Sequence, residues 1–221
     1  MKRDGSAVTR PRWTVAGGGR RSVVLVLVAL ALLLAAGGAA VGCGSKGHPG
    51  AGSETPAVTY TNDEYGFSIT YADTLSQVAP ASASGNADGA ALEVLFADAR
   101  EAALPGRYTD VLRVSVYDLT REVKPHHARG IERELQASVN QMIAALTSGR
   151  VVKRLRPVTS HGVPGYALKY TYTQDGDRLI AVTLFLFKGE REYQVTAQAA
   201  AADWEDLKAE LETALESFTV V

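Results

Sequence analysis

Apolar and polar residues alternate along several stretches between residue 57 and the C-terminus, which is the pattern of β-strands with one buried face. The segments 92–97 and 112–117 are clear examples, and the turn-forming residues 62–66 separate two shorter ones. The segment 179–187 is apolar on both faces, which predicts a central strand covered on both sides. Strands are expected at 58–61, 67–71, 92–97, 112–117, 151–159, 166–173, 178–187 and 192–199.

The spacing of the apolar residues changes to a helical period in two other segments. In 128–146 they fall on one helix face, and Gly149 follows as a stop. The segment 203–218 has the same period, with Trp204 on its apolar face and Asp203 as the predicted N-cap. An antiparallel sheet with helices packed against it is an α+β fold, and we expect an α/β/α sandwich in which helices flank the sheet.

The first 42 residues have a different character. A basic segment ends at Arg20-Arg21, and the apolar run 22–41 follows it, which is the pattern of a bacterial export signal. The sequence A-V-G-C at residues 40–43 then resembles a bacterial lipobox. That resemblance implies lipidation of the Cys43 sulfur and cleavage just before it. The alternative is that 22–41 stays as an uncleaved membrane anchor, and both interpretations place the body on the extracytoplasmic face of the cell membrane.

Three regions follow from these patterns. Residues 1–42 are a predicted signal peptide, and 43–56 are a predicted flexible tether rich in Gly, Ser and Pro. Residues 57–221 hold all the periodic apolar faces and form one predicted domain. Because Cys43 is the only cysteine, an intramolecular disulfide is impossible.

The charge is unevenly distributed along the chain. Of 23 basic and 24 acidic residues, six basic and one acidic lie before residue 43, so the remainder has a formal charge of −6. A body of that sign argues against nucleic acid as a partner. It also argues against adhesion to an anionic bilayer by charge alone. The residues Lys153, Arg154 and Arg156 are the one local positive exception, and a solvated strand face is their ordinary explanation.

Several motifs resemble one known family. They are E-Y-G-F-S-I-T-Y at 64–71, H-G-V-P-G-Y-A-L-K-Y-T-Y at 161–172, E-Y-Q-V-T-A-Q-A at 192–199, and Trp204. In this order they resemble the PsbP-like/Mog-type fold, whose bacterial members include lipoproteins of the LpqN type. The resemblance implies a binding or assembly role, because the family's best-known members are an extrinsic photosynthetic subunit and a nuclear-transport accessory factor. It implies no shared catalytic site.

Candidate chemistry is sparse. The chain has no G-x-S-x-G elbow, no P-loop and no H-E-x-x-H motif. His126 and His127 are adjacent, so their side chains point apart and suit shared metal ligation poorly. Asp175 and Asp177 flank a glycine as turn residues do. We therefore predict no catalytic residue, no metal site and no cofactor, and lipidation at Cys43 is the one predicted site.

These observations favour a non-catalytic, membrane-anchored lipoprotein that binds a protein or a cell-envelope component. The alternatives are a carrier of a lipid or another apolar ligand, which needs a cavity between sheet and helix, and an enzyme with dispersed catalytic residues. The segments 79–90 and 119–128 are the favoured contact surfaces, because they are long and polar. The tyrosines Tyr166, Tyr170 and Tyr172 share one strand face, where core packing and an aromatic binding platform are both open.

Replacing Cys43 by serine is expected to leave an uncleaved precursor without acyl chains, because a serine hydroxyl cannot form the thioether that precedes cleavage. Intact mass and incorporation of a labelled fatty acid measure the two effects separately. If the wild-type protein never takes up the label, the lipobox interpretation is wrong.

Overall fold

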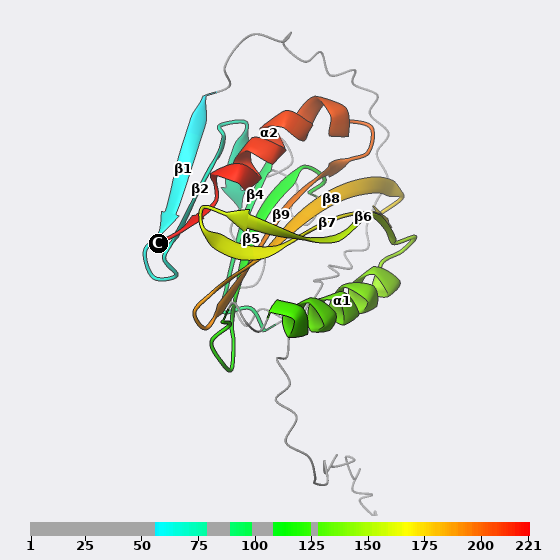
Figure 1. Cartoon of the computed structure of the whole chain (residues 1–221). Helices are drawn as coiled ribbons and strands as arrows, with labels where there is room; N and C mark the ends of the chain where they lie inside the picture. Colours follow the sequence, from blue (N-terminus) through cyan, green and yellow to red (C-terminus); the bar gives the residue numbers. More distant parts are fainter. Residues whose placement is uncertain (1–55, 79–88, 99–107, 125–127) are drawn as a thin grey trace, which may run out of the picture.

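The computed structural model describes residues 56–78, 89–98, 108–124 and 128–221, which form two antiparallel sheets and two helices (Figure 1). The predicted signal peptide, Cys43 and the predicted tether up to residue 55 lie outside these ranges. The large sheet has seven strands in the order β3 (Leu75–Val78), β4 (Leu92–Asp98), β5 (Val111–Asp118), β9 (Arg191–Ala200), β8 (Asp177–Lys188), β7 (Val163–Gln174) and β6 (Arg150–Ser160). The small sheet has the order β1 (Ala57–Asn62), β2 (Phe67–Ala72) and β10 (Thr219–Val220).

Short hairpins connect the strands β6 to β9, as the sequence predicts. The turn between β7 and β8 places Asp175 and Gly176 at positive φ values of 52° and 96°. Glycine reaches this left-handed region without a steric penalty, and aspartate tolerates it better than most residues do. Asp175 is therefore a turn residue, and Asp177 follows the turn as the first residue of β8.

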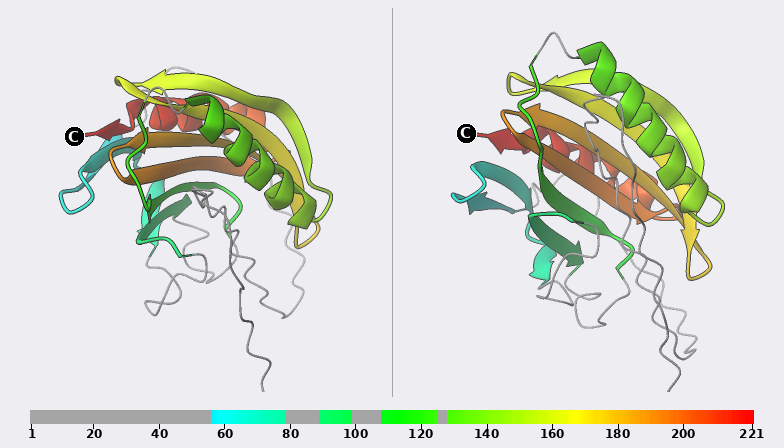
Figure 2. Two further views of the ribbon diagram at one scale, coloured as in Figure 1. Left: turned by 60° about the horizontal axis from the view of Figure 1, so that its bottom comes forward. Right: turned by 90° about the horizontal axis from the view of Figure 1, so that it is seen from below.

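The two helices lie on opposite faces of the large sheet (Figure 2). Helix α1 (Ala128–Ala145) buries its apolar face against strands β7 and β8. Helix α2 (Trp204–Ser217) packs against β9 and β2, so it lies between the two sheets. Asp203 occupies the N-cap position of α2, but its side chain makes no capping hydrogen bond. The predicted side-chain cap at Asp203 is therefore wrong.

The expected α/β/α sandwich is correct only in part. The fold is rich in antiparallel sheet, and α2 covers the large sheet together with a second sheet that the sequence pattern does not predict. The strands β1 and β2 of this small sheet are predicted, but its third strand β10 has only two residues, too few to show a period. Both helices and the eight predicted strands are present.

Strand β8 is covered unequally on its two faces. Leu179 and Phe185 face α1 and are fully buried, whereas Ile180 and Val182 on the other face are half-buried. The central position that the apolar run predicts is confirmed, because β8 lies between β9 and β7. The second face is less covered because α2 lies over β9 and β2 instead of β8.

Trp204 fixes the start of α2 on the large sheet, since it is only 1% exposed within the core between the two sheets. Replacing Trp204 by alanine is expected to lower the free energy of unfolding by about 3–5 kcal/mol, through lost burial and the cavity left behind. Urea denaturation measures the change, with Val58→Ala as a control at a position 42% exposed. A loss below about 1 kcal/mol at Trp204 would contradict this packing.

Candidate functional site

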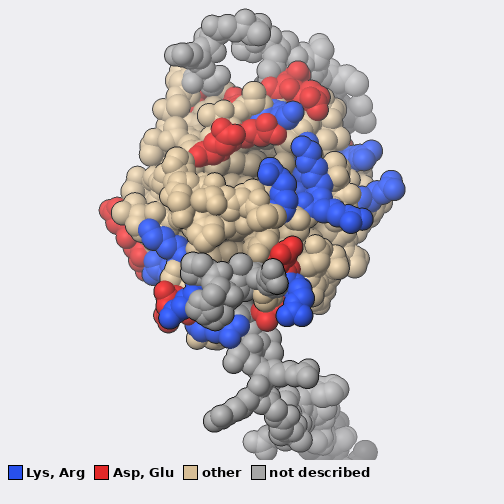
Figure 3. Space-filling view, viewed as in Figure 1, with Lys and Arg blue, Asp and Glu red and all other residues tan. Residues whose placement is uncertain are grey.

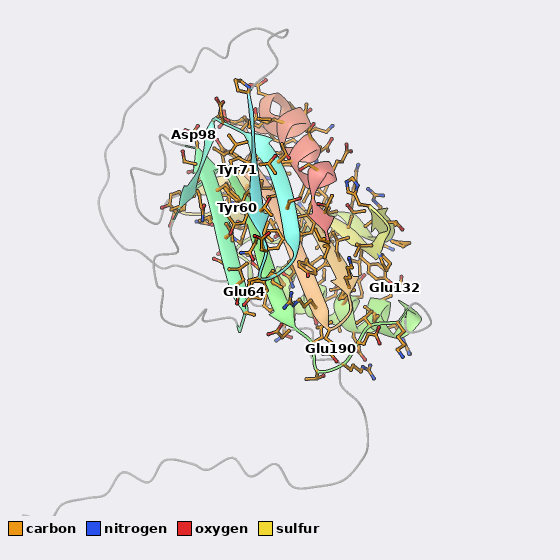
Figure 4. The ribbon with its side chains drawn as sticks, turned by 90° about the vertical axis from the view of Figure 1, so that its left-hand side faces the viewer. Tyr60, Glu64, Tyr71, Asp98, Glu132 and Glu190 are labelled. Carbon is orange, nitrogen blue, oxygen red and sulfur yellow. The ribbon has the colours of Figure 1, made fainter. Side chains whose placement is uncertain are left out.

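An open cleft of about 550 Å³ lies at one end of the molecule, where two turns and the C-terminus meet. The turn between β1 and β2 forms one wall, and the turn between β8 and β9 forms the opposite wall. Figure 4 shows Glu64 and Glu190, one from each turn, at this same end. Six charged residues contribute to the lining: Asp63, Glu64, Asp118, Glu190, Lys188 and Arg191.

Arg191 connects the walls of the cleft. Its guanidinium carbon lies 5.0 Å from the centre of the Tyr65 ring, a cation–π contact. Its Nη1 donates to the Glu64 carbonyl oxygen at 3.4 Å, and its Nε lies 3.9 Å from Asp118 Oδ1. A guanidinium has five N–H donors, so these contacts leave others for a molecule in the cleft. Because the Asp118 side chain is 70% exposed, the ion pair itself contributes little to stability.

Hydrogen bonds to backbone carbonyl oxygens fix the residues around the cleft. The Tyr193 hydroxyl donates to the Tyr65 carbonyl oxygen at 2.8 Å, which connects strand β9 to the β1–β2 turn. The backbone N–H of Val221 donates to the Gly66 carbonyl oxygen at 2.8 Å, and Gly66 has a φ of 63°. Lys188 donates from Nζ to the Val220 carbonyl oxygen at 3.0 Å. The cleft is therefore built on residues that are fixed by the fold.

A second polar group lies on the face of the large sheet that α1 packs against. Glu192 is 1% exposed, and its Oε1 accepts a hydrogen bond of 2.8 Å from Gln194. Burial raises the pKa of the Glu192 carboxyl from 4.5 to about 7, although the Gln194 bond acts in the opposite direction. Thr183 and Thr196 bond to each other at 2.9 Å, and Tyr172 donates to Gln198. These residues satisfy one another within the core.

The tyrosines Tyr166, Tyr170 and Tyr172 are buried under α1. The rings of Tyr170 and Tyr172 stack with their centres 6.0 Å apart. Burial raises the pKa of both hydroxyls. Of the two interpretations left open by the sequence, core packing is therefore the correct one for these side chains.

Of the other predicted residues, the structure describes only the basic ones on β6. Lys153, Arg154 and Arg156 lie exposed on the edge strand β6. Cys43, His126 and His127 lie outside the described residues, as do 79–88 and 125–127 of the two favoured contact segments. Among the described residues, no group of three or more His, Cys, Asp or Glu could hold a metal ion. None of the described helices is long and apolar enough to span a membrane.

The cleft is the feature that the sequence pattern did not reveal. Its walls come from E-Y-G at 64–66 and from the turn K-G-E-R at 188–191, which are distant in sequence and read only as hairpin turns. An arginine and a tyrosine beside glycine turns are a weak signal on their own. These residues form a recognisable cleft only because the small sheet brings the two turns together.

The sequence and the fold both match known proteins. Residues 57–220 match the sequence profile of the PsbP family. The solution structure of cyanobacterial PsbP (CyanoP) from Synechocystis sp. PCC 6803 is similar, with 17% identity and a TM-score of 0.53, over 79% of this chain and 98% of that chain. This likeness shows the fold alone.

The crystal structure of LpqN, involved in cell envelope biogenesis of Mycobacterium tuberculosis, is also similar to this chain. It has 12% identity and a TM-score of 0.49, over 75% of this chain and 91% of that chain. No curated protein matches the sequence. Because the family profile extends over the whole predicted domain apart from its last residue, the resemblance is confirmed, and the chain belongs to the PsbP family.

Proposed function

We propose that this protein is a non-catalytic accessory module, held on the extracytoplasmic face of the cell membrane by a lipid on Cys43. Its cleft between the β1–β2 and β8–β9 turns would bind a protein or another cell-envelope component. Membership of the PsbP family supports the accessory role, and the lipobox-like residues 40–43 support the anchor.

The position of the cleft relative to the start of the domain carries the proposal. Strand β1 runs antiparallel to β2, so Ala57 lies at one end of β1 and the 63–66 turn lies at the other (Figure 1). Since β1 has six residues, this separation is about 20 Å. A lipid on Cys43 would therefore hold the domain by the end remote from the cleft. The cleft would then stay accessible to a partner.

The lining of the cleft also favours a macromolecular partner over an apolar ligand. Sites for small apolar molecules are concave and mostly hydrophobic, whereas six charged side chains line this open cleft. A second hollow of about 70 Å³, next to Tyr108 and Gln174, has less than the volume of an acyl chain. Neither hollow supports the alternative of a lipid carrier.

A photo-crosslinking amino acid in place of Glu190 is expected to give a discrete adduct in the native host, because this position faces the cleft. The matched control replaces Arg133, an exposed residue of α1 on a different surface. Replacing Arg191 by alanine should weaken the Glu190 adduct at least about fivefold, since truncating a contacting arginine often costs more than about 1 kcal/mol. Equal adducts from both positions, or none from the cleft, would contradict the proposal.

Glu192 allows the enzyme alternative to be tested, because a carboxyl with a raised pKa is a typical acid–base candidate. In the folded protein it keeps its proton up to about pH 7, while in the unfolded chain it ionises near 4.5. Its contribution to stability is therefore largest below pH 4.5 and falls as the pH rises to 7. Glu192→Gln should reduce the stability difference between about pH 5 and about pH 8 by about 2–3 kcal/mol.

Urea denaturation at the two pH values measures this effect. The same wild-type and variant proteins are then screened against ester, peptide, glycoside and phosphate substrates. No turnover is expected from either protein. Turnover that survives repurification and disappears in Glu192→Gln would overturn the accessory role.

A further inference from the structure

Strand β6 is an edge strand with an unusual composition. It contains four basic residues and no acidic residue, although the body as a whole is acidic. Arg150, Lys153, Arg154 and Arg156 are all exposed, and within the described part of the chain none of them forms an ion pair. Figure 3 shows basic side chains gathered on this side of the molecule, below an acidic band. We call these four residues the β6 basic edge.

Two further cations extend the β6 basic edge toward α2. Lys169 of β7 lies opposite Lys153 in the sheet register, and it also lies near Lys208 of α2. Burial and then these two like charges lower the pKa of the Lys169 ammonium, while Glu212 and Glu205 act against them. Lys169 Nζ lies 4.3 Å from the centre of the Trp204 ring, which holds it in place. The cations are therefore crowded together, and crowded like charges favour an anionic partner.

Apolar side chains lie within the same strand. Val151 and Val152 are 40% and 52% exposed, and they are among the few large hydrophobic residues exposed in the described structure. They lie between Arg150 and Lys153, where the register of β6 is irregular. Such β-bulges disturb the regular ladder and are common on edge strands. The surface therefore combines positive charge with exposed apolar groups.

We propose that the β6 basic edge contacts the anionic phospholipid headgroups of the membrane that anchors the protein. Basic side chains attract an anionic lipid surface, with each cation worth about a fivefold change in binding. The exposed valines would enter the boundary between headgroups and acyl chains, as apolar residues of peripheral proteins do. This proposal rests on the membrane anchoring in the proposed function.

The tether favours lipid over an acidic protein segment as the occupant of this surface. Residues 43–56, when fully extended, reach at most about 50 Å, so an anchored domain stays close to the bilayer. At that distance the effective concentration of headgroups around the domain is high, whereas an acidic protein segment would have to be recruited. Glu205 and Glu212 of α2 lie near Lys169 and offset part of its charge. The acidic residues more than about 10 Å from β6 do not cancel the attraction, because they are screened at about 0.1 M salt.

The contact would also orient the cleft. The register pairs Arg150 with Thr171, near the turn between β7 and β8. The cleft contains the turn between β8 and β9, at the other end of β8. Arg150 therefore lies toward the end of the large sheet that is remote from the cleft, whereas Arg156, opposite Ala167, lies nearer to the cleft. With the β6 basic edge on the bilayer, the cleft lies at an end of the sheet and not on the strand that faces the lipid.

The test uses the full-length protein reconstituted in vesicles, with a polarity-sensitive fluorescent amino acid in place of Val152. In vesicles of equal parts phosphatidylglycerol and phosphatidylcholine, we expect a blue shift and quenching by a lipid-borne quencher. Pure phosphatidylcholine should give neither effect. Raising the salt from about 0.1 M to about 1 M should reverse the shift, because the Debye length falls from about 10 Å to about 3 Å.

Paired variants identify the residues responsible. Lys153→Gln with Arg156→Gln should move the contact equilibrium about 25-fold toward the detached state, at about fivefold for each lost cation. Lys124→Gln with Arg133→Gln removes the same charge from other exposed positions and should have no effect. Circular dichroism establishes that both variants fold. Loss of the fluorescence blue shift then means that β6 no longer contacts the headgroups.

Three results would overturn the proposal. They are equal fluorescence in anionic and neutral vesicles, equal loss in both paired variants, or a shift that occurs in cells but not in any vesicle. The last result would assign the surface to an acidic protein segment. The intact mass reports acylation of Cys43 separately. Since either a lipid or the uncleaved 22–41 run tethers the chain to vesicles, failure of the lipid anchor and failure of the headgroup contact are distinguishable.

Discussion

The packing of strand β9 is the constraint on which the fold depends, because its two faces carry opposite chemistry. Along 192–199 the residues alternate between glutamate, glutamine or threonine on one face and tyrosine, valine or alanine on the other. The apolar face ends in Ala197 and Ala199, whose small side chains leave space for Trp204 of α2. The polar face lies in the core as well, so its groups must bond to one another or to neighbouring strands. Gln194 does so with Glu192, and Thr196 does so with Thr183.

The position of α2 over β9 determines where both candidate surfaces form. Ser217 at the end of α2 accepts from the Thr70 backbone N–H at 2.8 Å and also donates to the Thr70 carbonyl oxygen, which fixes the small sheet beside the helix. The small sheet then brings the β1–β2 turn to the β8–β9 turn, and the cleft is the space between them. Because α2 covers β9 and β2, it leaves the outer strand β6 exposed. The position of one helix is therefore linked both to the cleft and to the exposure of the basic outer strand.

Periodicity predicted those parts of the fold in which the burial of a single segment decides the structure. The helix at 128–145, the strands β6 to β9 and the burial of Trp204 are of this kind, since each carries its own apolar face. The third strand of the small sheet could not be predicted, because β10 is short and pairs with β2 only where α2 brings the two together. Asp203 has the residue type of a cap, but its αR backbone leaves the side chain without a capping bond. The cleft depends on these long-range contacts and was missed for the same reason.

The net charge of the body predicts repulsion from an anionic bilayer, whereas the local charge of β6 predicts attraction. The distance of each charge from the bilayer decides which effect is larger. A formal charge of −6 beyond residue 42 suggests repulsion from an anionic bilayer if it is treated as one total. The acidic residues, however, include those of α2 and of the cleft, whereas β6 carries only positive charge. Screening limits each exposed charge to roughly 10 Å at about 0.1 M salt, so a bilayer beside β6 experiences mainly the cations of that strand. The same acidic surfaces would be repelled if they faced the lipid. Attraction at β6 and repulsion elsewhere therefore favour one orientation of a tethered domain, which a uniformly basic or acidic body would lack.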